Sequence, residues 1–233
     1  MVLMVKTLTL LTFLAVFSQG AFANFPGDSI DLRRIRHRAV RDLIIKEGVT
    51  TAKDFQALET SCYGTSDTSQ FNTHIRNYRL NAGVEDAWAQ YASVSPKEAW
   101  TGRMVHFDFL FSRFANRIIY EDEARDPMAE GNIIYVKLRL LNGIKNLSVA
   151  FEITGMDPVN KVIRFCYLKD GKSKGSQEIR FAALSDSTTL ITHETHYHSD
   201  SKFRDRKLYP RFHERLVGEF HNNLRTRIET RKS

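Results

Sequence analysis

Cysteine, proline and glycine are scarce in this sequence, with two, five and twelve of them among 233 residues. Two cysteines are too few for a disulfide-stapled mini-protein or a multi-cysteine zinc module. The low proline and glycine counts exclude collagen-like and proline-rich low-complexity sequence. The chain also lacks a serine nucleophile elbow, a phosphate-binding glycine loop and a dinucleotide fingerprint. With 42% hydrophobic and 26% charged residues, it has the balance of an ordinary globular protein.

The first 23 residues have the pattern of a secretory signal peptide. A single charge, Lys6, precedes an apolar run over residues 7–17, and Ala21-Phe22-Ala23 supplies a small-x-small cleavage motif. The run is shorter than the roughly 20 apolar residues that a membrane span needs. We therefore expect cleavage near Ala23 and release of a soluble chain into the periplasm or, as the second choice, into the medium.

Basic residues dominate the charge of the chain. The formal net charge is +7 at pH 7, and loss of Lys6 with the signal peptide leaves 7 − 1 = +6. The basic residues gather over 33–41, 202–215 and 225–232. Such patches favour nucleic acid in cytosolic proteins, but export argues against it, and we expect no nucleic-acid partner. A solvated helix face explains the patches, and attraction to an anionic membrane surface is the alternative.

The two cysteines, Cys62 and Cys166, meet an oxidising environment after export. Their spacing alone leaves two interpretations open, because pairing depends on geometry. Either they form a disulfide, or Cys166, which lies in a strand-like run, is a small buried hydrophobic side chain.

The first half of the chain has mainly helical patterns. Apolar residues recur at helical spacing in five segments, namely 31–46, 51–60, Phe71 to Tyr78, 84–91 and Trp100 to Phe111. Ser95-Pro96-Lys97-Glu98 is typical of a helix start, with Ser95 as the N-cap. We therefore predict a helical region over 24–93 and a further helix after Ser95.

After residue 113 the pattern changes to the two-residue alternation of β-strands. The alternation predicts strands at 118–120, 132–141, 149–154, 162–168, 177–184 and 188–198. Turn signals separate them without intervening helices, so the sheet should be antiparallel. A final long helix carries an apolar stripe that has to cover the sheet: Leu208, Phe212, Leu216, Phe220, Leu224 and Ile228.

This order of elements resembles the helix-grip fold of the START-like superfamily, which includes polyketide cyclases and plant allergens. Local motifs carry the resemblance over about residues 94–228: the helix start at Ser95, the strand–turn–strand from Phe151 to Phe165, and the hairpin from Gly175 to Thr192. It implies an α+β domain over 94–233, with an antiparallel sheet wrapped around the C-terminal helix. The region 24–93 departs from the simplest members, whose chain begins with a strand, and is expected to form an extra cap or wrap.

The resemblance also implies a cavity between sheet and helix that binds an apolar or amphipathic small molecule. The residues expected to contact it are Phe151, Phe165, Phe181, Tyr197, Phe212, Leu216 and Phe220. The alternative is a space filled by side chains, for which sixteen Phe and eight Tyr would suffice. No cofactor is expected, and no residue is assigned a catalytic role.

The run from His193 to His198 is the most conspicuous polar cluster. On a strand, Glu194, His196 and His198 share one face, and His193 lies on the other. A carboxylate and two imidazoles on one face are candidate metal ligands. The alternatives are a solvated face and, if they point into the pocket, polar ligand recognition.

Three functions stay open on the sequence alone. The leading interpretation is an exported protein that binds a hydrophobic or amphipathic, lipid-like molecule. The first alternative is a cyclase-like or hydrolytic enzyme in which His193, Glu194, His196 and His198 supply acid and base. The second alternative is an envelope interaction protein that acts through its basic surface.

Overall fold

The computed structural model of the protein describes residues 29–64 and 68–232. The predicted signal peptide, residues 1–23, lies outside these described residues. Within them, no helix is both long enough and apolar enough to span a bilayer.

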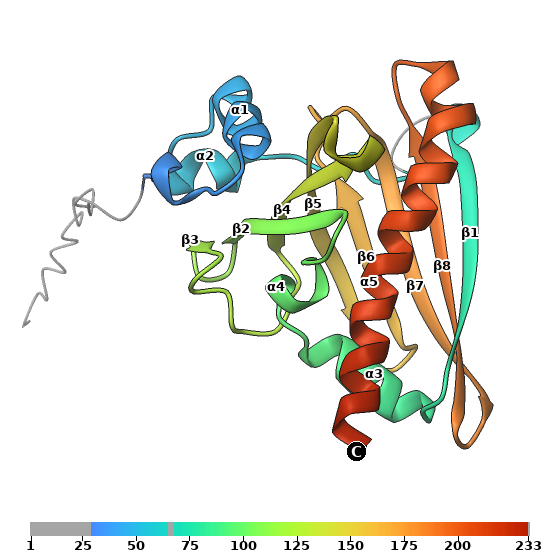
Figure 1. Ribbon diagram of the computed structural model, residues 1–233. Helices are drawn as coiled ribbons and strands as arrows, with labels where there is room; N and C mark the ends of the chain where they lie inside the picture. The colour runs from blue at the N-terminus through green and yellow to red at the C-terminus, as the bar shows by residue number, and fades with distance from the viewer. Residues whose placement is uncertain (1–28, 65–67, 233) are drawn as a thin grey trace, which may run out of the picture.

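All eight strands form one antiparallel sheet in the order β1-β8-β7-β6-β5-β4-β2-β3 (Figure 1). The bounds are β1 Asn72–Leu80, β2 Val105–Ser112, β3 Arg117–Tyr120, β4 Asn132–Leu140, β5 Lys145–Asp157, β6 Val162–Tyr167, β7 Lys174–Ser185 and β8 Thr188–His198. Consecutive strands from β4 to β8 are neighbours, as expected for strands joined by tight turns. The predicted antiparallel sheet is confirmed.

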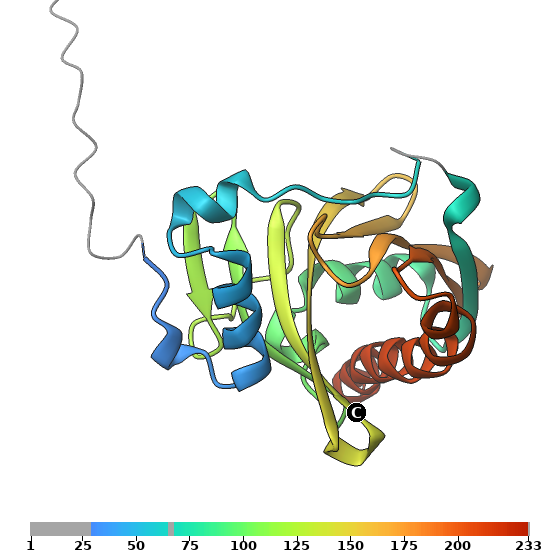
Figure 2. The ribbon, with the colours of Figure 1, turned by 90° about the horizontal axis from the view of Figure 1, so that it is seen from above.

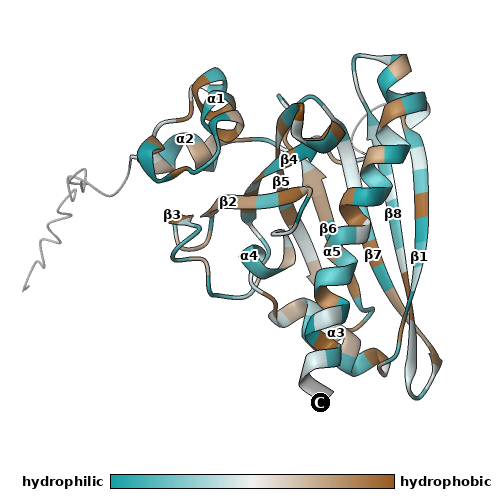
Figure 3. Cartoon of the chain, viewed as in Figure 1, coloured by the Kyte–Doolittle hydropathy of each residue, from teal (hydrophilic) through white to brown (hydrophobic). Residues whose placement is uncertain are grey.

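The inner core lies between one face of the sheet and the long C-terminal helix α5 (Tyr209–Lys232), which a π-helical turn, η4 (Arg204–Leu208), precedes. Figure 3 shows hydrophobic and hydrophilic positions alternating along α5, as its stripe predicts. Phe220, Leu224 and Ile228 are buried against the sheet. Two shorter helices, α3 (Val84–Ser93) and α4 (Pro96–Ala99), contact α5 and complete this core.

The N-terminal helices α1 (Arg38–Glu47) and α2 (Ala52–Ala57) pack on the opposite face of the sheet, as Figure 2 shows. They build a second core in which Val40, Ile44 and Phe55 are buried against outward side chains of β2 and β4. Phe55 meets the Tyr135 ring edge-on, with ring centroids 5.9 Å apart. Helices α1 and α2 therefore form a wrap on the back of the sheet, whereas α3, later in the predicted region 24–93, packs on the inner face.

A hydrogen-bonded pair fixes the start of α1 on β2. The register of β2 shifts between Phe107 and Phe109, and the extra residue of this bulge, Asp108, is fully buried. Its Oδ1 accepts hydrogen bonds from the His37 backbone N–H (3.3 Å) and from His37 Nδ1 (3.0 Å). Burial raises the pKa of Asp108, and the nearby His37 opposes that shift. The bulge thus supplies the polar anchor of the wrap.

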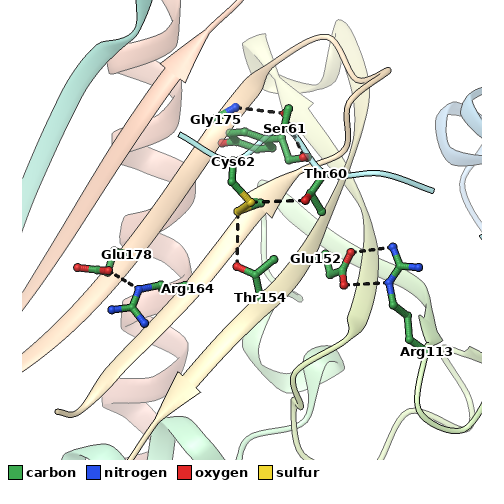
Figure 4. The surroundings of a disulfide bond; sticks show 11 residues. Thr60, Ser61, Cys62, Arg113, Glu152, Thr154, Arg164, Gly175 and Glu178 are labelled. Atoms are coloured by element: carbon green, nitrogen blue, oxygen red, sulfur yellow. Dashed lines mark hydrogen bonds and ion pairs between the residues drawn. A yellow bond between two sulfur atoms is a disulfide. The ribbon is translucent and has the colours of Figure 1, made fainter. Parts of the chain in front are cut away.

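Arg113 fixes the end of α2. Its Nε and Nη2 each donate to the Glu152 carboxylate at 2.9 Å, the pair drawn in Figure 4. Its Nη1 and Nη2 also donate to the backbone oxygens of Gln56 (2.7 Å) and Leu58 (2.6 Å). Because bidentate guanidinium–carboxylate pairs are directional, Arg113 holds the α2 segment in one position against β5.

A disulfide between Cys62 and Cys166 joins the end of the wrap to β6 (Figure 4), which settles the alternative that the sequence left open. Ser61 runs beside the end of β6: its backbone N–H donates to Tyr167 O, and its O accepts from Gly175 N, both at 2.8 Å. Cys166 and its neighbour Tyr167 point to opposite faces of the strand. The bridge therefore lies on the outer face, behind the inner core.

Two segments predicted to be helical are strands. Residues 72–80 form β1, so the sheet begins inside the region 24–93. The helix that starts after Ser95 ends at Ala99, and the residues expected to continue it form β2. The start itself is confirmed, since Ser95 Oγ accepts from the Glu98 N–H at 3.2 Å. In β2 both faces are covered, so nearly every side chain is buried and the alternation disappears.

Removing the disulfide is expected to lower the free energy of unfolding by about 2–4 kcal/mol, because the bond restricts the unfolded chain over a long loop. The two cysteines are separated by 104 residues. Guanidinium unfolding of the double variant Cys62→Ser, Cys166→Ser against the wild type measures the loss. The unfolding midpoint of the double variant should not change when a reductant is added. A wild-type midpoint that is equal with and without reductant would contradict the bridge.

Candidate functional site

A cavity of about 520 Å³ lies between the inner face of the sheet and the first half of α5. Trp100, Val136, Phe151 and Leu216 supply apolar walls from α4, β4, β5 and α5. Known ligand pockets measure about 300–1,000 Å³, so the space has room for a small molecule. The alternative of a sheet–helix interface filled throughout by side chains does not apply to this end of α5.

Aromatic packing closes the inner end of the cavity. Phe220, one turn beyond Leu216 on α5, stacks on Trp100 with ring centroids 4.3 Å apart. Phe151 meets Trp100 edge-on at 5.1 Å and Phe165 edge-on at 5.7 Å. Past this cluster the apolar side chains of α5, such as Leu224 and Ile228, are buried and do not line the cavity, so the cavity ends at Trp100.

A buried hydrogen-bonded network lies on the inner faces of β7, β8 and α5. Gln177 Oε1 meets His193 Nε2 at 2.8 Å and His213 Nε2 at 3.2 Å. His193 Nδ1 meets His221 Nε2 at 2.9 Å, and His221 Nδ1 meets the Tyr91 hydroxyl at 2.8 Å. All five side chains are buried, and Gln177 and His213 also line the cavity.

The amide oxygen of Gln177 fixes the proton positions in this network. An amide oxygen only accepts, so His193 and His213 both carry a hydrogen on Nε2. Neutral His193 then accepts at Nδ1 from His221 Nε2–H, and His221 accepts at Nδ1 from the Tyr91 O–H. Among the described residues, His213 Nδ1 has no hydrogen-bond partner. The network is therefore satisfied by neutral rings, with one acceptor left over.

Burial keeps the three histidines of the network uncharged. Desolvation lowers the pKa of His193 to about 3, and the nearby His74 lowers it further. Desolvation likewise lowers the pKa values of His213 and His221, and the neighbouring imidazoles lower them further. The inner face thus offers hydrogen-bonding groups without charge.

Two tyrosines extend the network into the cavity. Gln177 Nε2 donates to the Tyr167 hydroxyl at 3.0 Å, and the Tyr167 and Tyr209 hydroxyls lie 2.6 Å apart. Burial raises the pKa of Tyr167 to about 12, so the hydroxyl stays protonated. Only one of the two hydroxyl hydrogens is used between the tyrosines. Since both residues line the cavity, the other hydrogen is available to an oxygen atom of a bound molecule.

The seven residues expected to contact a ligand fall into three groups. Phe151, Phe212 and Leu216 line the cavity. Phe165, Phe181 and Phe220 are buried in the inner core beyond the cavity wall. Tyr197 stacks on Tyr209 with ring centroids 3.6 Å apart, and its hydroxyl donates to Asp205 O at 2.9 Å. It therefore supports a cavity-lining residue from behind.

Glu194, His196 and His198 point away from the cavity, on the outer face of β8. Glu194 accepts from Arg180 Nη2 at 2.6 Å and lies 2.9 Å from His196 Nε2. The His196 ring stacks on Tyr63 at 3.8 Å. Over residues 29–64 and 68–232, no group of three His, Cys, Asp or Glu side chains is placed to hold a metal ion. Of the four residues considered for acid–base chemistry, only His193 faces inward.

The sequence analysis missed most of the polar network. His213 and His221 lie eight residues apart on α5, on the same side as the buried Val217. The two imidazoles lie in the row beside the apolar stripe, next to Phe212 and Phe220, and histidines repeated at this spacing beside such a stripe are a usable signal. Gln177 gave no such signal, because one polar residue at the end of a strand is common.

The buried histidines predict acid sensitivity. In the unfolded chain each takes up a proton near its ordinary pKa of 6.5, whereas the folded protein keeps it neutral. Their contribution to stability is therefore complete above about pH 6.5 and is lost as pH falls toward 3, by up to about 1.4 kcal/mol per pH unit for each histidine. Urea unfolding between pH 7.5 and pH 5 should show this slope.

Variants separate this effect from other acid-titrating groups. His193→Gln removes one of the three protons that the network takes up on unfolding, so its slope should be shallower than that of the wild type. His198→Gln removes a histidine from the outer face and leaves the network intact, so the wild-type slope should persist. Identical slopes for wild type and His193→Gln would show that the network does not carry the acid sensitivity.

Neither a family model nor a curated protein matches this sequence. A solved structure of a norcoclaurine synthase mutant from Thalictrum flavum superposes with a TM-score of 0.52 at 11% identity, covering 70% of this chain and 97% of that one. An aromatase/cyclase from Streptomyces sp. R1128 (TM-score 0.49, 12% identity, 70% and 96% covered) and a START superfamily protein from Mycobacterium smegmatis (0.47, 11%, 68% and 97%) are also similar. At such identities the likeness concerns the fold alone. With its antiparallel sheet closed by α5, the chain has the helix-grip fold that its order of elements predicted.

Proposed function

We propose that this protein is exported and binds a hydrophobic or amphipathic, lipid-like molecule in the cavity between the sheet and α5. The observation that carries the proposal is the cavity itself, with apolar walls at Trp100, Phe151 and Leu216. Transfer of apolar ligand surface from water into such walls is favourable by about 25 cal/mol per Å² before the costs of association. The hydroxyl hydrogen of the Tyr167–Tyr209 pair then orients an oxygen atom of the ligand.

The disulfide supports the export part of the proposal. Disulfides persist mainly in oxidising compartments and are rare in the cytosol. The Cys62–Cys166 bridge is a structural link between two packed segments, with no third cysteine in the chain to exchange with it. Fractionation of the native host, followed by detection of the processed chain, tests the location directly.

Native mass spectrometry of the protein purified from its own host tests the binding function. A stoichiometric adduct that organic solvent extracts is the expected result, and its mass identifies the ligand class. A protein that carries no adduct and binds no apolar probe in titration would contradict the proposal.

Filling the cavity should abolish binding without unfolding the protein. Leu216→Trp adds an indole to the cavity wall, and we expect the affinity for the neutral probe N-phenyl-1-naphthylamine to fall at least about tenfold, since steric overlap with a ligand is costly. Fluorescence titration measures it. Val159→Trp is the matched control, because Val159 is 84% exposed in the β5–β6 turn and lies away from the cavity. Equal affinities for the two variants would place the probe elsewhere.

A further inference from the structure

Helix α1 reaches the cavity from the far side of the sheet. Ala39, Leu43 and Lys46 of α1 line the same cavity as Leu216 of α5, although the two helices cover opposite faces (Figure 2). The sheet is open between them, because β5 pairs with β6 only from Phe151 onward. The cavity therefore passes through a gap in the sheet, and the wrap supplies its back wall.

Two segments border the gap. One is the first part of β5, residues 145–149, which pairs with β4 alone. The other is the β6–β7 turn, residues 168–173, which lines the cavity opposite it. The C-terminal end of α1 lies beside the β6–β7 turn. Burial, together with the charge of Asp170 in that turn, raises the pKa of Glu47 of α1 to about 7.

The border of the gap carries uncompensated positive charge. Lys46, Lys145 and Lys172 line it. Among the described residues, the lysines that form ion pairs are Lys97, Lys161 and Lys169, so the three lysines at the gap have no carboxylate partner within ion-pair distance. Arg204 also lines the cavity, and its guanidinium donates to the Ser199 hydroxyl (2.9 Å) and to the Lys172 carbonyl. These four cations come from four separate segments and meet at one opening.

The carboxylates at the same opening balance this charge only in part. Asp42 forms an ion pair with Arg38 at 3.6 Å, so Arg38 already compensates part of its charge. Burial raises the pKa of Glu47 to about 7, which weakens its negative charge at neutral pH. Asp170 is the third carboxylate at the opening, and it also acts on the neighbouring Lys169. The opening is therefore net positive, in contrast to the uncharged interior.

We propose that the cavity binds a single-chain amphiphile with an anionic head group, such as a carboxylate, phosphate or sulfate. The head lies at the gap among Lys46, Lys145 and Lys172, and the apolar chain runs under α5 toward Trp100 and Phe151. This inference rests on the proposed function and names the ligand class of the same cavity. It also makes α1 a part of the binding site.

Two probes that share one ring system test the head-group preference. 1-Anilinonaphthalene-8-sulfonate and N-phenyl-1-naphthylamine differ by a single sulfonate. We expect the wild type to bind the sulfonate about 3- to 10-fold more tightly in low salt, with the preference shrinking as salt screens the lysines. Fluorescence titration of each probe gives the two dissociation constants.

Charge reversals locate the head group. Lys46→Glu and Lys172→Glu should each weaken binding of the sulfonate about 3- to 10-fold and change the neutral probe less than about twofold. Lys53→Glu, an exposed lysine of α2 away from the cavity, is the matched control and should change neither value. Unchanged binding of the neutral probe shows that a variant is folded, and if Lys46→Glu does not fold, Lys172→Glu decides.

The outcomes separate this inference from the proposed function. Equal affinity of the wild type for both probes, with no effect of Lys46→Glu or Lys172→Glu, would overturn the anionic head group while leaving a cavity that binds apolar molecules. Loss of sulfonate binding in Lys53→Glu to the same extent would also overturn it, because general surface charge would then explain the preference. Failure of both probes to bind would instead contradict the proposed function.

Discussion

The architecture depends on the burial of the part of the sheet formed by β2, β3 and β4, which is apolar on both faces. In β2 and β4, inward side chains such as Leu110 and Val136 belong to the inner core, and outward ones such as Phe109 and Tyr135 belong to the outer core. Neither face can be left in water without a large cost. Helix α5 covers one face and the N-terminal wrap covers the other, and the disulfide fastens the wrap to β6. The cavity lies where this double cover meets the gap between β5 and β6.

The sequence predicted α5 and the six strands from β3 to β8. The α5 stripe and the alternation of β8 gave the correct element types, and for β8 the correct bounds, because their exposed and buried positions differ in polarity. In β2 the bulge at Asp108 and burial on both faces erased the alternation, and the spacing of Phe107 and Phe111 imitated a helix. In β1 the inward positions His74 and Arg76 are polar, so its pattern gave no strand signal.

The candidate site was predictable in its apolar part and hidden in its polar part. Aromatic residues on a strand facing a helix stripe indicate a shared interior, which is how Phe151 and Leu216 were found. The network around Gln177 depends on three strands and two helices that meet only in the folded chain. No local sequence pattern predicts such a convergence. Lys46 lines the cavity only because β5 and β6 are unpaired at the gap, and this pairing is also not readable from the sequence.

The one-sided pairing of β5 has a mechanical consequence. Residues 145–149 pair with β4 alone, so this end of β5 has no strand pair with β6 and is held in the sheet only through β4 and its partner β2. The tip of the β4–β5 hairpin is exposed to solvent, and its Ile144 is 88% exposed. A bend confined to the tip, residues 140–145, would move one border of the opening without breaking a pair between β5 and β6. For the proposed ligand, exchange would then depend on the stiffness of this hairpin tip, and the global stability of the fold can be high without slowing it.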